Sequence, residues 1–308
     1  MQPKIAVVGG GLAGLATAVA LGSADYPVTV FEARPFLGGR ATSYPLNTGD
    51  ENSPTIDNCQ HVLLRCCANL IDFYRRLGVR DRIRFYREFY WIEPGGRVST
   101  MRRGILPAPF HFTGSFARLK FLSMADKYSV ATGLLAVRYE YGKRADLDRI
   151  TMLDWLREKR QTPRAIERFW RQVLVSAVSE DLDRMAAIHG LQVFALGFLD
   201  RADAYEMGVP NVPLRELYSE RAWANYPQVK IAERAAVERV QIEGNRVSAF
   251  MVNGEPVTAD AYVLALPFER LAAIAPDLPV DVSSFTHVPI TGIHLWFDRA
   301  ITKMPHAT

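Results

Sequence analysis

The segment Thr55–Arg65, TIDNCQHVLLR, places an acid, two amides, a thiol and a histidine among apolar residues. A histidine with its ordinary pKa near ~6.5 can donate or accept a proton around neutral pH. We therefore expect His61 to move a proton, with Asp57 orienting it and Gln60 donating a hydrogen bond to a bound group. The alternative interpretation is that these side chains cap the following helix or only hold a bound group in place.

The same segment could be imagined as a metal site, because Cys59, Cys66 and Cys67 lie close to His61 in the chain. Their spacing does not correspond to that of a recurring zinc site. Adjacent cysteines such as Cys66 and Cys67 also rarely bind one ion together. We therefore expect no metal here.

The first residues of the chain predict the element order strand, helix, strand. Lys4–Val8 is a run of β-forming residues, Leu12–Leu21 has the apolar spacing of a helix, and Val28–Phe31 is a second β-run that ends at Glu32. A glycine-rich turn, GGGLAG, joins the first strand to the helix. This is the arrangement of a βαβ unit that binds a dinucleotide.

Each glycine of the pattern Gly9-x-Gly11-x-x-Gly14 has a separate physical role. Gly9 permits a tight turn, Gly11 lets the backbone approach a pyrophosphate, and Gly14 lets the helix pack closely on the strand. The helix N-terminus then offers free N–H groups to phosphate oxygens. Glu32, 18 residues beyond Gly14, lies where a carboxylate can accept hydrogen bonds from ribose hydroxyls.

The continuation EARPFLGGRATSY resembles the extended signature of flavin enzymes of the amine oxidase and phytoene desaturase superfamily. That resemblance implies that the cofactor is FAD. The resemblance also implies that Arg34, Gly38, Gly39 and Arg40 bind the cofactor. Arginine suits this role, because its planar guanidinium can bind two phosphate oxygens at once.

The remaining pattern predicts an α/β protein in which a Rossmann-like FAD-binding domain, of the glutathione-reductase and amine-oxidase type, holds an inserted mixed α+β substrate domain. We expect the FAD-binding domain at 1–80 and 228–268 and the substrate domain at 81–227 and 269–308. By the resemblance, Val237 lies near the adenine. The remaining pattern also predicts a helix at Cys66–Leu77, a hairpin that turns at Gly95-Gly96, and helices through 116–198. Residues 229–266 show β alternation, with a buried strand that ends at Pro267. The segment IHLWF is strand-like, and we expect its His294 to be a core or pocket-wall residue.

Five separated segments resemble the bacterial squalene-associated FAD-dependent desaturases, which are hydroxysqualene dehydroxylases. These segments are DNCQH, RFWRQVLVSAVSED, VPNVPLRELY, ADAYVLALP and PITGIHLWFDRAITKMPHA. The resemblance implies reduction of hydroxysqualene to squalene, in squalene and hopanoid biosynthesis. His61 would then protonate the departing hydroxyl, helped by Asp57, and Gln60 would bind the flavin or that hydroxyl.

The chain departs from this family in two ways. Cys59 stands where the family has glycine, which is costly if the backbone there has a positive φ. The chain also ends about a quarter short of a typical member, so a second FAD motif, a Gly-Asp pair, would be missing, and a sheet edge and part of the pocket would be left open. The chain is then a fragment, or its cofactor binding is impaired.

Two further functions are compatible with the residues. A carotenoid desaturase, of the phytoene type, shares the fold, the FAD and the long isoprenoid substrate but runs oxidatively, and another flavoenzyme of the amine oxidase superfamily is a related alternative. A truncated, non-catalytic remnant would bind an isoprenoid or a partner enzyme without turnover. Bound flavin and product formation would separate these functions.

Composition limits the partners of the protein. The 308 residues carry a net charge of only +4, with the basic residues scattered, and this excludes nucleic acid as an expected partner. Three clustered cysteines and the lack of a leader pattern favour a cytoplasmic setting. The stretch MRRGILPAPFHFTGSFARLKFLSMADKYSVATGLLAVRYEYGKR interleaves basic and apolar residues, which indicates peripheral contact with the inner face of the cytoplasmic membrane. An ordinary amphipathic helix is the alternative interpretation. Association with other squalene-synthesis enzymes is also expected.

Overall fold

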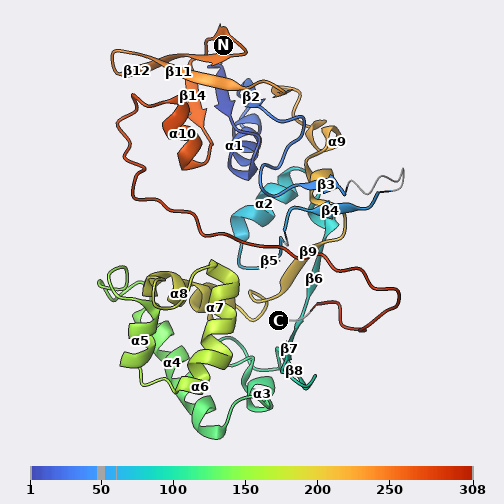
Figure 1. Cartoon of the computed structure of the whole chain (residues 1–308), viewed down its shortest axis with the longest axis vertical. Coiled ribbons are helices and arrows are strands. Elements are labelled where there is room, and N and C mark those ends of the chain that lie inside the picture. The colour runs from blue at the N-terminus through green and yellow to red at the C-terminus, as the bar shows by residue number, and fades with distance from the viewer. Residues whose placement is uncertain (1, 47–52, 60, 307–308) are drawn as a thin grey trace. The chain divides into compact units, whose positions relative to one another are not determined.

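The structure is a computed structural model that describes residues 2–46, 53–59 and 61–306 (Figure 1). The chain forms two compact units. The first contains residues 1–61, 69–84 and 210–293, and the second contains residues 62–68, 85–209 and 294–308. Each unit is described by itself below.

A parallel sheet forms the centre of the first unit. Its strands are β1 (Ile5–Val8), β2 (Val28–Glu32), β10 (Val229–Glu233) and β14 (Ala261–Leu264), in the order β10-β2-β1-β14. Helix α1 (Leu12–Gly22) connects β1 to β2 and lies beside the sheet in Figure 1. All four residues of β1 are buried, as expected for a strand with neighbours on both sides. The predicted βαβ unit and the α/β fold class are confirmed.

A second, antiparallel sheet covers one part of this unit. It consists of β11 (Val237–Glu243), β12 (Arg246–Val252) and β13 (Glu255–Val257). Its two turns use positive φ angles at Gly244 and at Asn253-Gly254, as the turn-forming sequences EGN and VNGE require. Phe250 is fully buried and packs with Ile274 of α10 (Phe268–Ile274) in one apolar cluster. This cluster joins the antiparallel sheet to the ends of the parallel strands.

The first unit includes three stretches that the sequence assigned to the substrate domain, 81–84, 210–227 and 269–293, while residues 62–68, which were assigned to the FAD-binding domain, belong to the second unit. The reason is visible in the hydrogen bonds: Asp57 and Ser43 bind the amides of Leu214 and Arg215, while α10 packs on the antiparallel sheet. The remaining elements of this unit are β3 (Ser43–Pro45), β4 (Thr55–Asp57), α2 (Ala68–Arg76), η1 (Arg80–Arg82), η4 (Leu214–Tyr218) and α9 (Glu220–Trp223).

The second unit is mostly helical around an aromatic core that includes Trp155, Trp170 and Phe194. Its elements are β5 (Leu63–Leu64), β7 (Glu88–Ile92), β8 (Val98–Arg102), α3 (Thr113–Ala117), α4 (Met124–Glu140), α5 (Met152–Glu158), α6 (Pro163–Ala165), η2 (Ile166–Trp170), α7 (Arg171–Val178), α8 (Ala187–Phe194) and η3 (Ala195–Leu199). Strand β5 pairs with β9 (Met207–Pro210), and β6 (Ile83–Tyr86) contains the point at which the chain passes from the first unit into the second.

Two caps fix the starts of helices in the second unit. Ser123 and Asp126 form a reciprocal capping box at the N-terminus of α4. Thr162 caps α6, with Pro163 in the first turn, as the sequence predicts for a helix start. The hydroxyl of Thr162 also donates to Asp126 at 2.6 Å, so the two helix starts are hydrogen-bonded to each other.

Two element predictions are corrected by the structure. The segment around His294 contains no strand, and Ile293, Leu295 and Trp296 are 60–79% exposed rather than core residues. A strand forms only where its amides find partners, and the described residues supply none beside this segment. Strand β14 is only half-buried, because it lies at the edge of the sheet. None of the described helices is long and apolar enough to cross a membrane.

Candidate functional site

The turn between β1 and α1 contains two glycines, Gly9 and Gly14, that no other residue could replace without movement. Gly9 has φ +105°, and a Cβ placed on it would lie 2.3 Å from the carbonyl oxygen of Ala265. A Cβ on Gly14 would lie 1.9 Å from the carbonyl oxygen of Gly9. Both contacts are with backbone, which cannot give way as a side chain can. The first turn of α1 therefore packs directly on the end of β1, the role predicted for Gly14.

A second glycine turn lies directly against the first. The amide of Gly38 donates to the carbonyl of Gly10 at 2.8 Å, and a β-bridge joins Gly11 to Gly38. Gly39 has φ +62°, and a Cβ on it would lie 3.0 Å from the Cα of Gly11. The sequence predicted that both turns bind the cofactor, and the structure brings them together. We call residues 9–14 with 38–39 the glycine cradle.

The N-terminus of α1 opens into this cradle. Its N-cap residue is Gly11, which has no side chain to accept hydrogen bonds from the first-turn amides. The amides of an 11-residue helix and its positive dipole end are therefore presented to an anion. A pyrophosphate fits at Gly11, because a Cβ there would meet nothing closer than 3.9 Å and glycine leaves that space open.

The Glu32 carboxylate is held by two backbone amides, one in the first glycine turn and one just beyond β2. Its Oε2 accepts from the amide of Gly10 at 2.7 Å, and its Oε1 accepts from the amide of Arg34 at 2.8 Å. The side chain is half-buried at the end of β2. Each oxygen keeps a further lone pair that can accept from a hydroxyl group. The position therefore suits the predicted ribose contact, and Glu32 also orders the cradle itself.

The other predicted cofactor residues surround the cradle less closely. The Arg34 guanidinium lies 5.7 Å from the centroid of the Phe36 ring, and the Arg40 side chain is exposed. Val237 is half-buried at the start of β11, in the same apolar cluster as Phe31. The segment before it joins the end of β2, since the amide of Ala235 donates to the carbonyl of Glu32. Val237 thus lies on the part of the chain that adjoins the predicted ribose carboxylate.

The polar segment Asp57–His61 has partners that differ from the predicted ones. Asp57 Oδ1 accepts from the amide of Leu214 at 3.0 Å, and His61 Nδ1 lies 3.2 Å from the carbonyl oxygen of Cys59. The structure therefore does not pair Asp57 with His61, as the sequence had suggested. The reason is that the segment is an extended strand end followed by a turn, not a helix, so residues four apart do not share a face. Gln60 lies outside the described residues.

Cys59 occupies the backbone conformation that was expected for glycine. Its φ is +67°, in the left-handed region. Its Sγ lies 3.1 Å from the position that a Cβ on Gly292 would take. The DNCQH segment and the PITGIHLWFDR segment, which the sequence singled out separately, are therefore in contact at Cys59 and Gly292.

A buried tyrosine pair supports the second glycine turn, and sequence reasoning did not identify it. Tyr74 and Tyr218 lie with their hydroxyl oxygens 3.4 Å apart, and a Cβ on Gly38 would lie 2.7 Å from the Tyr218 ring. Burial raises the pKa of both phenols above the ordinary range, so both stay neutral. The family-like segment VPNVPLRELY contained the signal, because it ends at Tyr218.

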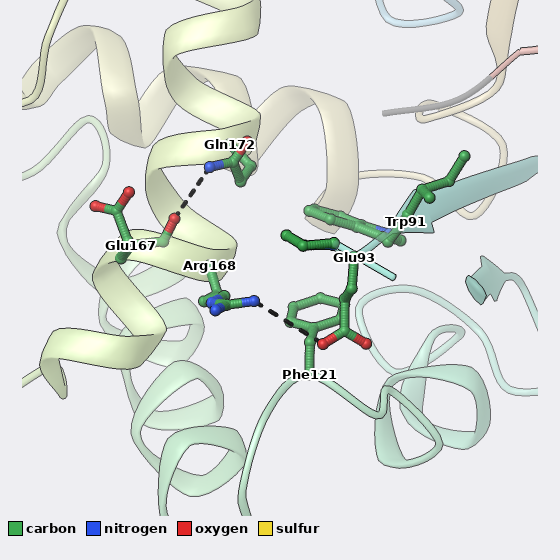
Figure 2. A pocket seen from close by; sticks show the side chains of 8 residues that line it. Trp91, Glu93, Phe121, Glu167, Arg168 and Gln172 are labelled. Carbon is green, nitrogen blue, oxygen red and sulfur yellow. Dashed lines mark hydrogen bonds and ion pairs between the residues drawn. The ribbon is translucent and has the colours of Figure 1, made fainter. Parts of the chain in front are cut away.

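A separate cavity of about 320 Å³ lies within the second unit (Figure 2). It is lined by aromatic and charged side chains, and the Arg168 guanidinium lies 3.9 Å from the Glu93 carboxylate. Gln172 donates to the Glu167 carbonyl at 3.2 Å. This mixed lining does not suit a hydrocarbon chain, whose binding rests on apolar surface. Among the residues described, no group of three or more acidic, histidine or cysteine side chains is arranged to hold a metal ion.

The sequence of this chain is similar to those of known flavin-dependent enzymes. The sequence model of a family described as flavin containing amine oxidoreductase matches residues 12–307. A zeta-carotene desaturase of Synechocystis is 27% identical over 98% of this chain and 66% of its own length. A 15-cis-phytoene desaturase of an Oncidium hybrid is 26% identical over 97% of this chain and 53% of its own length. The chain thus spans between half and two thirds of these relatives.

Solved structures show the same fold at lower sequence identity. An oxidoreductase from Methanosarcina mazei has a TM-score of 0.64 and 16% identity, over 91% of this chain and 63% of its own. Wild-type putrescine oxidase bound to putrescine has a TM-score of 0.63 and 18% identity, over 91% of this chain and 62% of its own. At these identities the likeness shows the fold alone, and that fold is of the amine-oxidase type.

Proposed function

Because this chain belongs to the flavin-containing amine oxidoreductase family, we propose that it is the FAD-binding part of an oxidoreductase that acts on a long-chain isoprenoid. The glycine cradle is the observation that carries the cofactor half of the proposal. The substrate half is supported by relatives whose names state that they act on carotenoids, along nearly the whole of this chain.

The cradle residues can hold FAD through its pyrophosphate and ribose. The amides of the first turn of α1 would bind phosphate oxygens, and Gly39 beside Gly11 would let the backbone approach them. Glu32 would accept from the ribose, since the turn amides already orient its carboxylate. A bound flavin supplies two-electron redox chemistry. The protein contributes binding, orientation and the exclusion of water.

Desaturation of a carotenoid, of the phytoene type, is the first candidate reaction. The similarity to zeta-carotene and phytoene desaturases, each matched over 97–98% of this chain, supports it. Such a reaction removes two hydrogens from neighbouring carbons of a hydrocarbon that has no polar group to grip. Recognition would then rest on burial of apolar area rather than on paired charges.

Reductive dehydroxylation of hydroxysqualene is the second candidate. The family-like segments DNCQH and PITGIHLWFDR favour it, and they are in contact through Cys59 and Gly292. The reaction replaces a C–O bond by a C–H bond and releases water, so it needs a hydride and a proton. His61, half-buried beside Cys59, would hold that proton for the departing hydroxyl. In this candidate the protein would work beside other squalene-synthesis enzymes.

A set of assays on the purified chain separates these candidates. Flavin absorbance after addition of FAD tests the cofactor. Conversion of phytoene or zeta-carotene with oxidised FAD and an electron acceptor would support desaturation, and conversion of hydroxysqualene with a reductant would support dehydroxylation. Bound flavin with none of these conversions would overturn the substrate half of the proposal. A protein that gains no flavin absorbance would overturn the cofactor half and favour a non-catalytic remnant.

A further inference from the structure

The loop Gly104–His111 presents an apolar surface to solvent at its tip. Ile105 is 101% exposed, and Leu106 and Phe110 are 47% and 57% exposed. The intervening residues Pro107, Ala108 and Pro109 are also uncharged. Apolar side chains gathered at an exposed tip mark a contact surface, whereas single exposed ones are ordinary.

Hydrogen bonds and a buried ring hold the base of this loop in place. The amide of Gly104 donates to the carbonyl of His111 at 2.6 Å, and the amide of Phe110 donates to the carbonyl of Pro107 at 2.9 Å. His111 is 1% exposed, and its ring lies 4.2 Å from that of Phe112. The loop therefore closes on itself and holds its apolar tip outward.

A second anchor holds the strand that enters the loop. The amide of Arg103 donates to the hydroxyl of Tyr205 at 3.1 Å, and that hydroxyl donates to the carbonyl of Arg87 at 2.8 Å. The Ser115 hydroxyl donates to the carbonyl of Arg102 at 2.7 Å just beyond the loop. Because these hydrogen bonds hold the base of the loop, its tip can insert into an apolar environment without unfolding the neighbouring residues.

The chain around the loop is basic and contains no acid. Residues 94–125 include five arginines and lysines and neither aspartate nor glutamate. Arg97 and Arg102 pair with Glu93 and Glu88. The other three, Arg103, Arg118 and Lys120, are exposed and have no carboxylate within 4.0 Å among the residues that the structure describes. Positive charge beside an apolar tip complements an anionic surface with an apolar interior.

Helix α4 continues the same character along the chain. Met124, Tyr128, Leu135 and Tyr139 are 57–78% exposed. Their spacing places them in one stripe of the helix, since residues four, eleven and fifteen apart lie on one face. Arg138 is exposed next to this stripe, where a long basic side chain can reach lipid headgroups.

We propose that the loop Gly104–His111 inserts its tip into the surface of an anionic phospholipid bilayer, with Arg103, Arg118 and Lys120 contacting the headgroups. Burial of the apolar tip in the bilayer and attraction of the three cations to anionic headgroups would both favour binding. Stable peripheral binding needs two such contributions. This inference rests on the loop and its charges alone, so it stands or falls independently of the redox function.

Vesicle sedimentation tests the proposal on the purified chain. We expect binding to phosphatidylcholine–phosphatidylglycerol vesicles that weakens with added salt, and much weaker binding to phosphatidylcholine alone. The double variant Ile105→Ser with Leu106→Ser should bind about tenfold less tightly, because burial of the apolar tip is lost. Val280→Ser, a change at an exposed apolar residue outside the loop, should bind like the wild type.

Two double variants that remove the same charge at different places test the contribution of the basic side chains. Arg118→Gln with Lys120→Gln should bind about fivefold or more weakly, while Lys230→Gln with Arg246→Gln, which removes the same charge elsewhere, should bind like the wild type. Because all of these side chains are exposed, thermal unfolding should not change. In a second measurement, Leu106→Trp should show a blue-shifted emission that brominated lipid quenches.

Three results would overturn the proposal. The first is equal and negligible sedimentation with both kinds of vesicle. The second is wild-type binding by the Ile105→Ser, Leu106→Ser variant. The third is a lipid-free oligomer that this variant dissolves, measured by light scattering, which would show that the loop is a contact between protein chains.

Discussion

The glycine cradle and the polar segment Asp57–His61 lie in the same compact unit. The shape of the cradle depends on residues within the two turns, whereas the contacts of the polar segment depend on the fold. In the cradle the backbone itself is the functional surface, and a Cβ at Gly9 or Gly14 would overlap a neighbouring carbonyl oxygen. In the polar segment the side chains make the contacts, and the partners of Asp57 and Cys59 come from distant parts of the chain. Asp57 binds the amide of Leu214, and Cys59 contacts Gly292.

A site made by a glycine turn can be predicted from neighbouring residues, whereas a site made by side chains depends on the fold. A glycine pattern constrains the backbone within its own turn, so spacing is enough to predict it. A polar side chain takes whichever partner the fold brings near, and that partner can be any distance away in sequence. Substitutions in the two regions should therefore change different quantities: the packing of the first turn in the cradle, and individual hydrogen bonds in the polar segment.

The largest effect on stability is expected from Gly14→Ala. Its methyl group would lie 1.9 Å from the carbonyl oxygen of Gly9, so α1 must move away from β1. We expect the free energy of unfolding to fall by about 3 kcal/mol or more, measured by urea denaturation. Gly11→Ala is the matched control in the same turn, because its Cβ meets nothing closer than 3.9 Å and its φ is −79°. Equal stability of the two variants would contradict the close packing.

An intermediate effect is expected from Asp57→Ala, because the buried amide of Leu214 loses its acceptor. The free energy of unfolding should fall by about 1 to 2 kcal/mol. Asp57→Asn keeps an acceptor oxygen and should lose less. If Asp57→Ala unfolds like the wild type but abolishes turnover, the carboxylate acts in chemistry and not in holding the 214–218 turn.

A smaller effect of opposite sign is expected at Cys59. Its φ of +67° is strained for a side chain, so Cys59→Gly should raise the free energy of unfolding by about 0.5 kcal/mol. Cys59→Val should lower it by about 1 kcal/mol, since a β-branched residue tolerates this region least. Thermal unfolding of the three proteins checks the order. Stabilisation by valine would show that the turn relaxes to negative φ.

The smallest effect on stability is expected from His61→Ala. The ring is half-buried, and its one described hydrogen bond is to the Cys59 carbonyl, so the free energy of unfolding should change by about 0.5 kcal/mol or less. If dehydroxylation is the reaction, the same variant should lose about a hundredfold or more of its rate with FAD still bound. Turnover of hydroxysqualene at the wild-type rate would remove His61 from the mechanism.

Much of the first unit could be predicted from the sequence because its signals are local. The β1-α1-β2 elements and the first glycine turn follow from residue types at fixed spacing, while the second glycine turn and the positive φ at Cys59 were indicated by the family resemblance. The partner of Asp57 could not be predicted, since Leu214 is 157 residues away. Nor could the tyrosine pair under Gly38, which joins two elements far apart in sequence. The strand expected around His294 failed for a related reason, because strand formation depends on a neighbour and not on β-forming residues alone.

The most direct test of the account is a titration of the wild type and Gly11→Ala with FAD, followed by flavin fluorescence. The cradle predicts that the wild type binds FAD and that the added methyl group, which faces the Gly39 turn, weakens binding by about tenfold or more without lowering the free energy of unfolding. Equal FAD affinity of the two proteins, or no binding by the wild type, would contradict the claim that the glycine cradle holds the cofactor.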